Sequence, residues 1–449
     1  MTAESHLFYL STAPRPQLAG ARGVYMWDVD GKRYLDGSSG AMVSNIGHSH
    51  PHVQEALRRQ IEQFTFGYRL HFQTEASEAL ATRTAALAPE GMDKVFFVSG
   101  GSEAVESAIK LARQWAVVTG QERRWKVISR YPSYHGCTLG ALALTGYDPL
   151  TAPFAPMMRE MPKVPAPRAY LDGLDPRNPA TGAHYAGLIE ERIVREGPDT
   201  VLAVMIEPIG GAATGALVPP AGYLQAVRDI CTRNGVLLIH DEVMTGGGRT
   251  GRFFGAEHWD VAPDILALSK GYGAGYAPLG AMVAHNRVVE PVQAAGGFLH
   301  GFTYAGNPLA CAAGLAVLQV IEAEGLIENA ARVGATLKAG LEGLMGTHEI
   351  IGDVRGKGLL LAFELVADRA TMRPLPTELN AHLELVELAY EDGLIIYSRR
   401  TRGGRTGDHF MVCPPMVATE DHVAEILEKL DRALTRFAPR HARAHAGAA

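Results

Sequence analysis

Two apolar segments point to the fold of this chain: Leu237-Leu238-Ile239-His240-Asp241-Glu242-Val243 and Leu266-Ala267-Leu268-Ser269-Lys270-Gly271. Each has the length of a buried strand, and the first ends in Asp241 and the second in Lys270. A charge that is buried without a partner is costly, so each of these side chains should meet a compensating group. Because ligands of open α/β proteins bind at the carboxyl ends of the strands, the two segments predict a binding site there.

Strand-like and helix-like segments alternate along much of the chain. Strands are expected at residues 94–99, 126–129, 201–206, 236–241 and 265–269, and helices at residues 51–64, 102–118, 222–234 and 307–323. Such alternation is typical of the α/β class, in which helices cover a mostly parallel sheet.

Composition limits the classes of protein to which the chain belongs. Apolar residues make up 47% of the 449 residues and charged residues 20%, as in globular proteins, and the formal net charge is −6. This charge offers no overall attraction to nucleic acid or to an anionic membrane, so neither is expected as a partner. The N-terminus lacks the pattern of a secretory signal, and no apolar stretch is as long as a spanning helix. The four cysteines are far apart without metal-ligand spacing, which favours a reducing cytoplasm and predicts no metal site.

Other elements suggest a second, smaller domain. A hairpin is expected around Asp30-Gly31, residues 153–179 form a proline-rich irregular loop, helices are expected at 326–345 and 377–392, and short strands at 359–365 and 409–413. We therefore assign residues 61–323 to a large domain and residues 324–449 to a small α+β domain. The N-terminal segment 1–60 is expected to contribute to the small domain, and residues 440–449 to form a frayed tail.

One cofactor needs both an amine and a carboxylate of the kind that end the first two segments. Pyridoxal 5'-phosphate (PLP) bonds a lysine through its aldehyde and carries a ring nitrogen that a carboxylate keeps protonated. A partly buried Lys270 would lose proton affinity and become a nucleophile. Each residue also has a simpler interpretation: Asp241 as the cap of the next turn, and Lys270 as a surface lysine at a strand end.

Three more motifs are candidates for the same site. In Val98-Ser99-Gly100-Gly101-Ser102-Glu103-Ala104 a strand leads into two glycines and a helix start, where free amides and the Ser102 hydroxyl would bind phosphate. Tyr134 could stack on a planar cofactor, and Thr303 could meet a phosphate. The simpler interpretations are a helix N-cap, a half-buried core tyrosine and a loop before a close-packed helix.

Two motifs resemble a dinucleotide-binding site and a metal site, but we interpret neither of them in that way. Gly246-Gly247-Gly248-Arg249-Thr250-Gly251 matches the glycine spacing of a dinucleotide fingerprint, but no amphipathic helix follows it. His48, His50 and His52 alternate around Pro51 without an acidic or cysteine residue nearby in the sequence, so we interpret them as loop histidines rather than as metal ligands.

A basic run lies near the C-terminus. Arg399-Arg400-Thr401-Arg402-Gly403-Gly404-Arg405 holds four arginines in seven residues. In a net-acidic protein such a run is consistent with recognition of a carboxylate or phosphate, and equally with a solvated loop.

Taken in order, these motifs resemble those of the class III, or ω-aminotransferase, family over nearly the whole chain. The ordered set is Ser99-Gly100-Gly101-Ser102-Glu103-Ala104, Tyr134-His135-Gly136, Glu207-Pro208-Ile209, Asp241-Glu242-Val243, Gly248-Arg249-Thr250-Gly251, Ser269-Lys270-Gly271 and Thr303. The resemblance implies a fold-type I PLP transferase, in which a large domain with a mostly parallel seven-stranded sheet is flanked by helices and joined to a smaller α+β domain. It also implies a homodimer with active sites at the interface, and it leaves open whether dimers pair into tetramers.

The resemblance implies a role for each matching residue. Lys270 would bond the PLP aldehyde, Asp241 would hold the ring nitrogen, Val243 and Tyr134 would pack on the two ring faces, Gly101 and Ser102 would bind the phosphate, Glu207 would lie near Asp241 and the cofactor, and Thr303 would reach the phosphate of the neighbouring subunit's cofactor.

Within the class, the chain is similar to amine:pyruvate and ω-amino acid:pyruvate enzymes, in which an arginine binds the substrate carboxylate. Arg405 precedes Gly407-Asp408-His409 as that arginine does, with Arg399 and Arg400 as alternatives. Met42 lies where many relatives carry an aromatic pocket residue.

The resemblance thus implies ping-pong transamination from an amine or ω-amino acid to a keto acid, with pyruvate as the expected acceptor. Two alternatives stay open. One is a PLP-dependent decarboxylase or aminomutase on the same fold, and the other is a non-catalytic binding protein.

Overall fold

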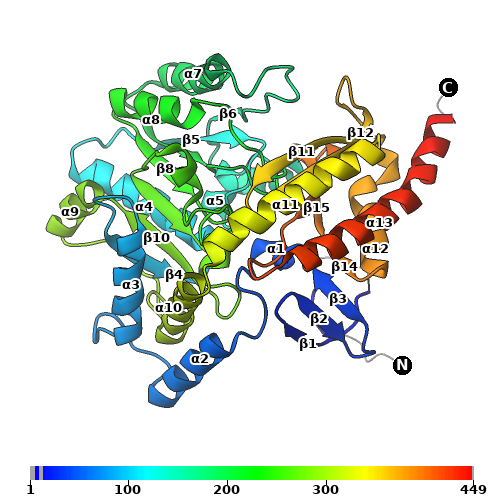
Figure 1. Cartoon of the computed structure of the whole chain (residues 1–449). Helices are drawn as coiled ribbons and strands as arrows, with labels where there is room; N and C mark the ends of the chain where they lie inside the picture. The colour runs from blue at the N-terminus through cyan, green and yellow to red at the C-terminus, as the bar shows by residue number, and fades with distance from the viewer. Residues whose placement is uncertain (1–5, 10–13, 447–449) are drawn as a thin grey trace.

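Three β-sheets organise the part of the chain that the computed structural model describes, residues 6–9 and 14–446. The largest has the strand order β4-β10-β9-β8-β7-β5-β6, and Figure 1 shows it with its helices to one side of the two smaller sheets. Its strands are β4 (Lys94–Val98), β5 (Lys126–Tyr131), β6 (Lys163–Pro165), β7 (Val201–Ile206), β8 (Leu237–Asp241), β9 (Ile265–Leu268) and β10 (Gly280–Ala284).

The seven-stranded sheet is mostly parallel, as predicted. Only β10 runs antiparallel to its neighbours, β4 and β9. Since β8 and β9 are parallel and Asp241 is in register with Ala267, the end of β8 lies beside the end of β9, just before Lys270. The two charged side chains that the sequence singled out therefore leave the same edge of the sheet.

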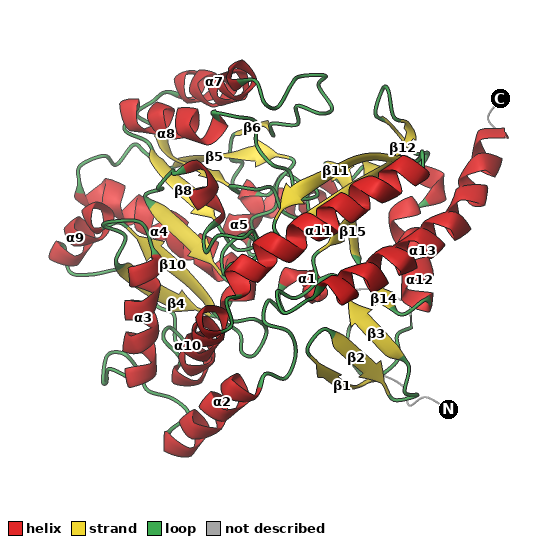
Figure 2. Cartoon of the chain, viewed as in Figure 1, coloured by secondary structure: helices red, strands yellow, loops and turns green. Residues whose placement is uncertain are grey.

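Helices cover both faces of this sheet (Figure 2). One apolar cluster joins α4 to one face, and another joins α7 and α8 to the opposite face. The helices of this part of the chain are α2 (Pro51–Gln63), α3 (Glu75–Leu87), α4 (Gly101–Val118), α5 (Leu139–Leu144), α6 (Asp148–Thr151), α7 (Pro179–Glu196), α8 (Tyr223–Arg233), α9 (Asn286–Ala294) and α10 (Pro308–Ala323).

The smaller sheets combine both ends of the chain. The first contains β1 (Leu18–Arg22), β2 (Tyr25–Asp28), β3 (Arg33–Asp36) and β14 (Leu394–Ile395), and the second contains β11 (Ile351–Lys357), β12 (Leu360–Asp368), β13 (Arg373–Pro374), β15 (Tyr397–Arg402) and β16 (Thr406–Val412). Leu35 of β3 pairs in parallel with Leu394 of β14, so N-terminal and C-terminal strands share one sheet. The remaining helices are α1 (Ser39–Met42), α11 (Leu326–Thr347), α12 (Ala381–Glu391) and α13 (Glu420–Ala446).

Arg249 is a buried structural residue. It belongs to the glycine-rich motif at residues 246–251, which has the glycine spacing of a dinucleotide-binding site. Its side chain is 0% exposed and donates hydrogen bonds to Asn45 Oδ1 and Ser39 Oγ, at 2.7 and 2.9 Å. It also donates to the carbonyl oxygens of Leu359 and Cys413, at 3.1 and 3.0 Å. One guanidinium therefore connects three distant parts of the chain.

The structure corrects several sequence expectations. Helix α13 continues to Ala446, so the prediction of a frayed tail is wrong for residues 440–446. Residues 447–449 lie outside the described part of the chain. Several elements were not predicted, namely strands β1, β6, β10, β11, β13, β14 and β15 and helices α1, α3, α5, α6, α7, α9 and α13. The irregular segment 153–179 includes β6, which pairs with β5 at the edge of the large sheet.

None of the helices in the described part of the chain is by itself long and apolar enough to cross a membrane. Helices α10 and α11 meet those requirements only when joined, as a pair bent by 64°.

Candidate active site

A cavity of about 150 Å³ lies where β8 and β9 end. It brings together residues from segments that are far apart in the sequence. Its lining consists of Gly101, Ser102, Tyr134, His135, Gly136, Glu207, Ile209, Asp241, Val243, Met244 and Lys270.

Asp241 ends β8 with its carboxylate fixed by two donors. Oδ1 accepts a hydrogen bond from the Val243 amide at 3.0 Å, and Oδ2 lies 2.8 Å from His135 Nδ1. The side chain is 5% exposed. A carboxylate has about four lone-pair positions. The Asp241 carboxylate can therefore accept a further hydrogen bond from a protonated ring nitrogen in the cavity.

Lys270 follows β9 and reaches the same cavity. Its backbone has a φ of +45°, a conformation that is uncommon outside glycine and that occurs at functional sites. Burial lowers the pKa of Lys270 to about 8, although the carboxylates of Asp241 and Glu207 act in the opposite direction. A neutral, nucleophilic amine is therefore accessible near physiological pH.

Glu207 supplies a second carboxylate to the cavity. Its Oε1 accepts from the Gly211 amide at 2.8 Å, while the nearest cationic group to Oε2 is Arg130 Nη2 at 3.6 Å. Burial raises the pKa of Glu207. Among the described residues, neither Glu207 Oε2 nor His135 Nε2 has a hydrogen-bond partner, so both can serve a bound group.

The N-terminus of α4 also borders the cavity, through Gly101 and Ser102. The N-cap, Gly100, has no side chain to bind the first amides of this 18-residue helix, so they are available to an anion. The backbone here is closely packed, since a Cβ on Gly101 would lie 2.9 Å from Val243 Cγ1. A Cβ on Gly136 would likewise lie 2.7 Å from Ser102 Oγ. The glycines thus keep this end open to a phosphate.

These features fit PLP. The α4 N-terminus suits the phosphate, the Asp241 carboxylate suits the ring nitrogen, and the Lys270 amine suits the aldehyde. The unpartnered buried atoms of Glu207 and His135 add polar capacity beside them. Tyr134 and Val243, expected against the ring faces, both line the cavity, and burial raises the pKa of Tyr134.

Thr303 lies elsewhere. It is exposed in the loop before α10 and does not line the cavity of its own chain. Asn307 caps that helix by accepting from the Ala310 amide at 3.0 Å. This position is compatible with a contact to another subunit.

The three candidate arginines have different surroundings. Arg405 is 74% exposed and pairs with Asp148. Arg400 donates to the Thr377 carbonyl at 2.8 Å and to Asn380 Oδ1 at 3.0 Å, away from the cavity.

Arg399 lies on β15 with its guanidinium carbon 4.8 Å from the centre of the Tyr397 ring. Its positive charge lowers the pKa of Tyr134, against the larger effect of burial, and Tyr134 lines the cavity.

Met42 is buried beside the cavity rather than in its lining. It is 1% exposed and belongs to an apolar cluster with Ile209 and Met411, against which Met244 and Tyr397 pack. Ile209 and Met244 carry this apolar surface into the cavity.

The sequence assigned no role to His135, Ile209 or Met244. His135 and Ile209 belong to the motifs Tyr134-His135-Gly136 and Glu207-Pro208-Ile209, and these motifs were the only sequence signal for their place in the site. The contact of His135 with Asp241 joins residues 106 positions apart, and no local pattern specifies it.

The alternating histidines form separate pairs. His48 lies 2.9 Å from Asp36, which precedes it by 12 residues, and His50 lies 2.8 Å from Glu324, which is 274 residues away. Among the side chains that the structure describes, in residues 6–9 and 14–439, no group of three or more histidines, cysteines, aspartates or glutamates is arranged to hold a metal ion.

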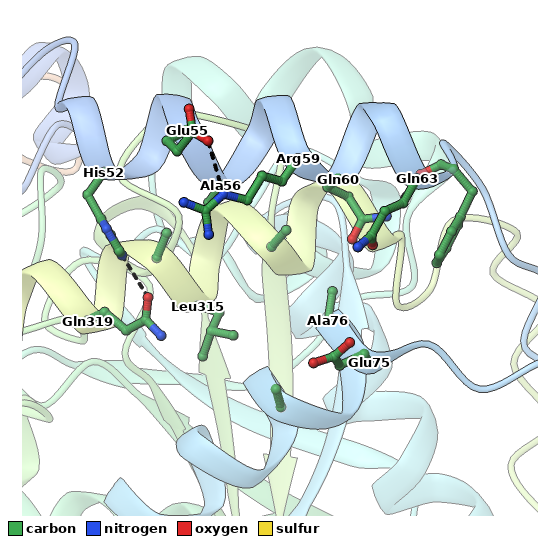
Figure 3. A pocket seen from close by; sticks show the side chains of 14 residues that line it. His52, Glu55, Ala56, Arg59, Gln60, Gln63, Glu75, Ala76, Leu315 and Gln319 are labelled. Carbon is green, nitrogen blue, oxygen red and sulfur yellow. Dashed lines mark hydrogen bonds and ion pairs between the residues drawn. The ribbon is translucent and has the colours of Figure 1, made fainter.

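Figure 3 shows a second cavity, of about 280 Å³, between α2, α3 and α10. His52 bonds to Gln319 and Glu55 to Arg59 along its rim. Its lining contains neither Lys270 nor Asp241, so the PLP-type chemistry belongs to the first cavity.

Comparisons with known proteins agree with this site. The family model for class-III aminotransferases matches residues 13–434. The chain is 36% identical to the taurine–pyruvate aminotransferase of Bilophila wadsworthia, over 92% of this chain and 91% of that one. It is 32% identical to the putrescine–pyruvate aminotransferase of Pseudomonas aeruginosa, over 93% and 90%.

Solved structures give the same result. An amine transaminase from an uncultivated Pseudomonas species, solved with PLP bound, has a TM-score of 0.91 and 36% identity, covering 97% of this chain and all of the other. An (S)-enantioselective ω-transaminase from Thermomicrobium roseum has a TM-score of 0.90 and 36% identity, over 96% of both chains. The chain therefore belongs to the class-III aminotransferases and is a PLP-dependent transaminase of fold type I.

Proposed function

We propose that this aminotransferase moves the amino group of a primary amine or ω-amino acid to pyruvate. The observation that carries the proposal is the cavity in which Lys270, with a pKa lowered to about 8, faces Asp241 and the open N-terminus of α4. Relatives named for taurine–pyruvate and putrescine–pyruvate transamination support pyruvate as the acceptor.

Seven residues of the cavity have a proposed task in the reaction. PLP, when bound, supplies an aldehyde that bonds amines and a ring that withdraws electrons. Asp241 holds the proton of the ring nitrogen, and Gly101 and Ser102 bind the phosphate. Lys270 would act as a general base that takes the proton from the amine-bearing carbon of the donor. It would then act as a general acid that returns this proton to the carbon of the PLP aldehyde group. Tyr134 and Val243 confine the ring, and Glu207 lies beside its polar edge.

We further propose that Arg399 binds the carboxylate of the keto acid. Its charge acts on Tyr134 in the cavity lining, whereas Arg405 is engaged by Asp148 at the surface. Arginine suits this task because its planar fork matches a carboxylate. The methionines around the apolar side, Met42 and Met244, suit donors with varied apolar groups because their side chains adapt in shape.

The assembly and location are also part of the proposal. A homodimer with the active sites at its interface would explain why Thr303 is exposed in the single chain. All four cysteines are free thiols, which supports a reducing cytoplasm. The sequence placed residues 1–60 and 324–449 in a small domain and 61–323 in a large one. The β3–β14 pairing supports joining the two ends of the chain, but α2 packs on α10, so we propose that the N-terminal part of the small domain ends before Pro51.

The direct test supplies the purified, PLP-loaded protein with pyruvate and one donor at a time. The donor panel is β-alanine, 4-aminobutyrate, taurine, a diamine and an arylalkyl amine. Alanine should form with at least one donor, and Lys270→Ala should lose about 10²-fold or more of this rate. Release of carbon dioxide or an isomerised amine without alanine would instead identify a decarboxylase or an aminomutase. No reaction with any donor, or full activity of Lys270→Ala, would contradict the proposal.

A further inference from the structure

A buried arginine outside the cavity lies against the loop that carries Glu207. Arg355 is on β11 and is 7% exposed. Its guanidinium pairs with Asp353 at 2.8 Å and with Glu364 at 2.9 Å, and its central carbon lies 4.6 Å from the centre of the Tyr170 ring. Two carboxylates and an aromatic face therefore hold this side chain in one orientation.

Arg355 also donates to the backbone of that loop. Nε donates to the Gly215 carbonyl at 2.6 Å, and Nη2 donates to the Thr214 carbonyl at 2.9 Å. Gly215 has a φ of +64°, and a Cβ at this residue would lie 2.8 Å from Nη2. The turn and the guanidinium are thus in direct contact.

The turn at residues 211–215 fixes the side chain of Glu207. The amides of Thr214 and Gly215 donate to the Gly211 carbonyl at 3.2 and 2.9 Å. The Gly211 amide donates to Glu207 Oε1 at 2.8 Å, and the carboxylate lines the cavity with Lys270. A continuous series of hydrogen bonds therefore runs from Arg355 to the active-site carboxylate.

We propose that Arg355 is a positioning residue for transamination, which fixes the 211–215 turn and thereby orients the Glu207 carboxylate toward Lys270. The inference rests on the proposed function. The carboxylates of Asp241 and Glu207 favour the protonated form of Lys270, and the charge of Arg249 disfavours it. A negative Glu207 favours the protonated nitrogen, so a displaced Glu207 lowers the pH at which the lysine nitrogen loses its proton.

The test compares Arg355→Lys with the wild type, both loaded with PLP. Lysine keeps the charge against Asp353 and Glu364 but does not bind two carbonyls as a fork. We expect the rate of the donor half-reaction to fall about tenfold, because a misplaced polar group costs catalysis steeply. The pH midpoint of the cofactor absorbance should shift downward, and hydrogen exchange should become faster in the peptide that contains Gly211.

A control is Arg228→Lys, which alters a partly buried arginine that also pairs with an aspartate, Asp264, at 3.0 Å. Its half-reaction rate should stay within about twofold of the wild type, because its partners do not contact the Glu207 loop. If it shifts the midpoint as much as Arg355→Lys does, the effect is general destabilisation and the inference is overturned.

A double-mutant cycle identifies the route of the effect. In a Glu207→Gln background, Arg355→Lys should not shift the midpoint further, since the carboxylate that it orients is gone. Additive shifts would overturn the inference. If Arg355→Lys does not fold, Arg355→Gln combined with Glu364→Gln removes both charges together and should give the same downward shift.

The two proposals fail in different ways. A wild-type protein that forms no alanine contradicts the proposed function. An active wild type whose Arg355 variants keep the wild-type midpoint and exchange rate contradicts the positioning role alone.

Discussion

Lys270 is surrounded by groups that affect its charge in opposite directions. Burial lowers its pKa to about 8, while Asp241 and Glu207 favour its protonated form. A solvent-exposed lysine has a pKa near 10.4, so an exposed amine at pH 8 would be neutral in less than about one molecule in a hundred. Lys270 would be neutral in about half of the molecules at that pH.

This difference predicts how the cofactor-free protein captures PLP. The rate of covalent capture should rise about tenfold per pH unit below pH 8 and level off above it, because only the neutral amine attacks an aldehyde. Stopped-flow absorbance between pH 6 and 9.5 measures this rate. A simple alkylamine should continue to gain rate toward pH 10 in the same buffers, and a parallel rise for the protein would contradict the lowered pKa.

The arginines give a second prediction for single residues. Arg399→Ala should raise the KM for pyruvate about 10-fold to 100-fold while changing the KM for an apolar amine much less, since only the keto acid carries the carboxylate. Arg405→Ala is the matched control and should change both values by less than about threefold, because its ion pair with Asp148 is largely exposed. The opposite ranking of the two variants would transfer the role to Arg405.

Much of the candidate site was predictable from local sequence. Asp241 and Lys270 end short apolar strands, and Gly101 and Ser102 open a helix, so each has a recognisable pattern within a few residues. The neighbours of these residues were not predictable. The position of His135 against Asp241 depends on how two strands and a loop pack together.

At the scale of the element, α4 has an N-terminus without a side-chain cap and a tightly packed second glycine. Gly101→Ala should weaken PLP binding about tenfold, because the new Cβ would lie 2.9 Å from Val243 Cγ1 and must displace either the helix start or the valine. Fluorescence titration of the cofactor-free protein with PLP measures the Kd.

The adjacent glycine offers a control for this change. Gly100 has an extended backbone with a φ of −170°, and a Cβ on it would meet no atom within 4 Å. Gly100→Ala should therefore keep the Kd within about twofold, at a small cost in helix capping. Equal losses in both variants would show that packing against Val243 is not the cause.

The elements themselves were predictable where apolar residues are large and regularly spaced. β7 has the expected bounds, and α4 differs by a single residue. β10 was missed because Gly280–Ala284 consists largely of glycine and alanine, which give little strand signal. In α3, Glu75–Leu87, alanines and threonines replace large apolar residues, so its helical period is weak.

At the scale of the whole molecule, Arg249 connects the segments near Asn45, Leu359 and Cys413. Arg249→Met should lower the free energy of unfolding by about 3–5 kcal/mol, because several buried acceptors would lose their donor. Urea unfolding followed by circular dichroism measures this loss. Arg15→Ala, which breaks an exposed pair with Glu387, should lower it by less than about 1 kcal/mol. Similar losses of unfolding free energy in the two variants would contradict the conclusion that Arg249 stabilises the fold by connecting these segments.

The sharing of one sheet by β3 and β14 has a consequence for synthesis on the ribosome. Lys32, next to β3, donates a hydrogen bond to the Tyr390 carbonyl, 358 residues further along the chain. At about 5–20 residues per second, roughly 20–70 seconds separate the emergence of these two segments. During that interval all strands of the seven-stranded sheet leave the ribosome. This sheet is therefore able to form while β3 is still without its partner strand, β14.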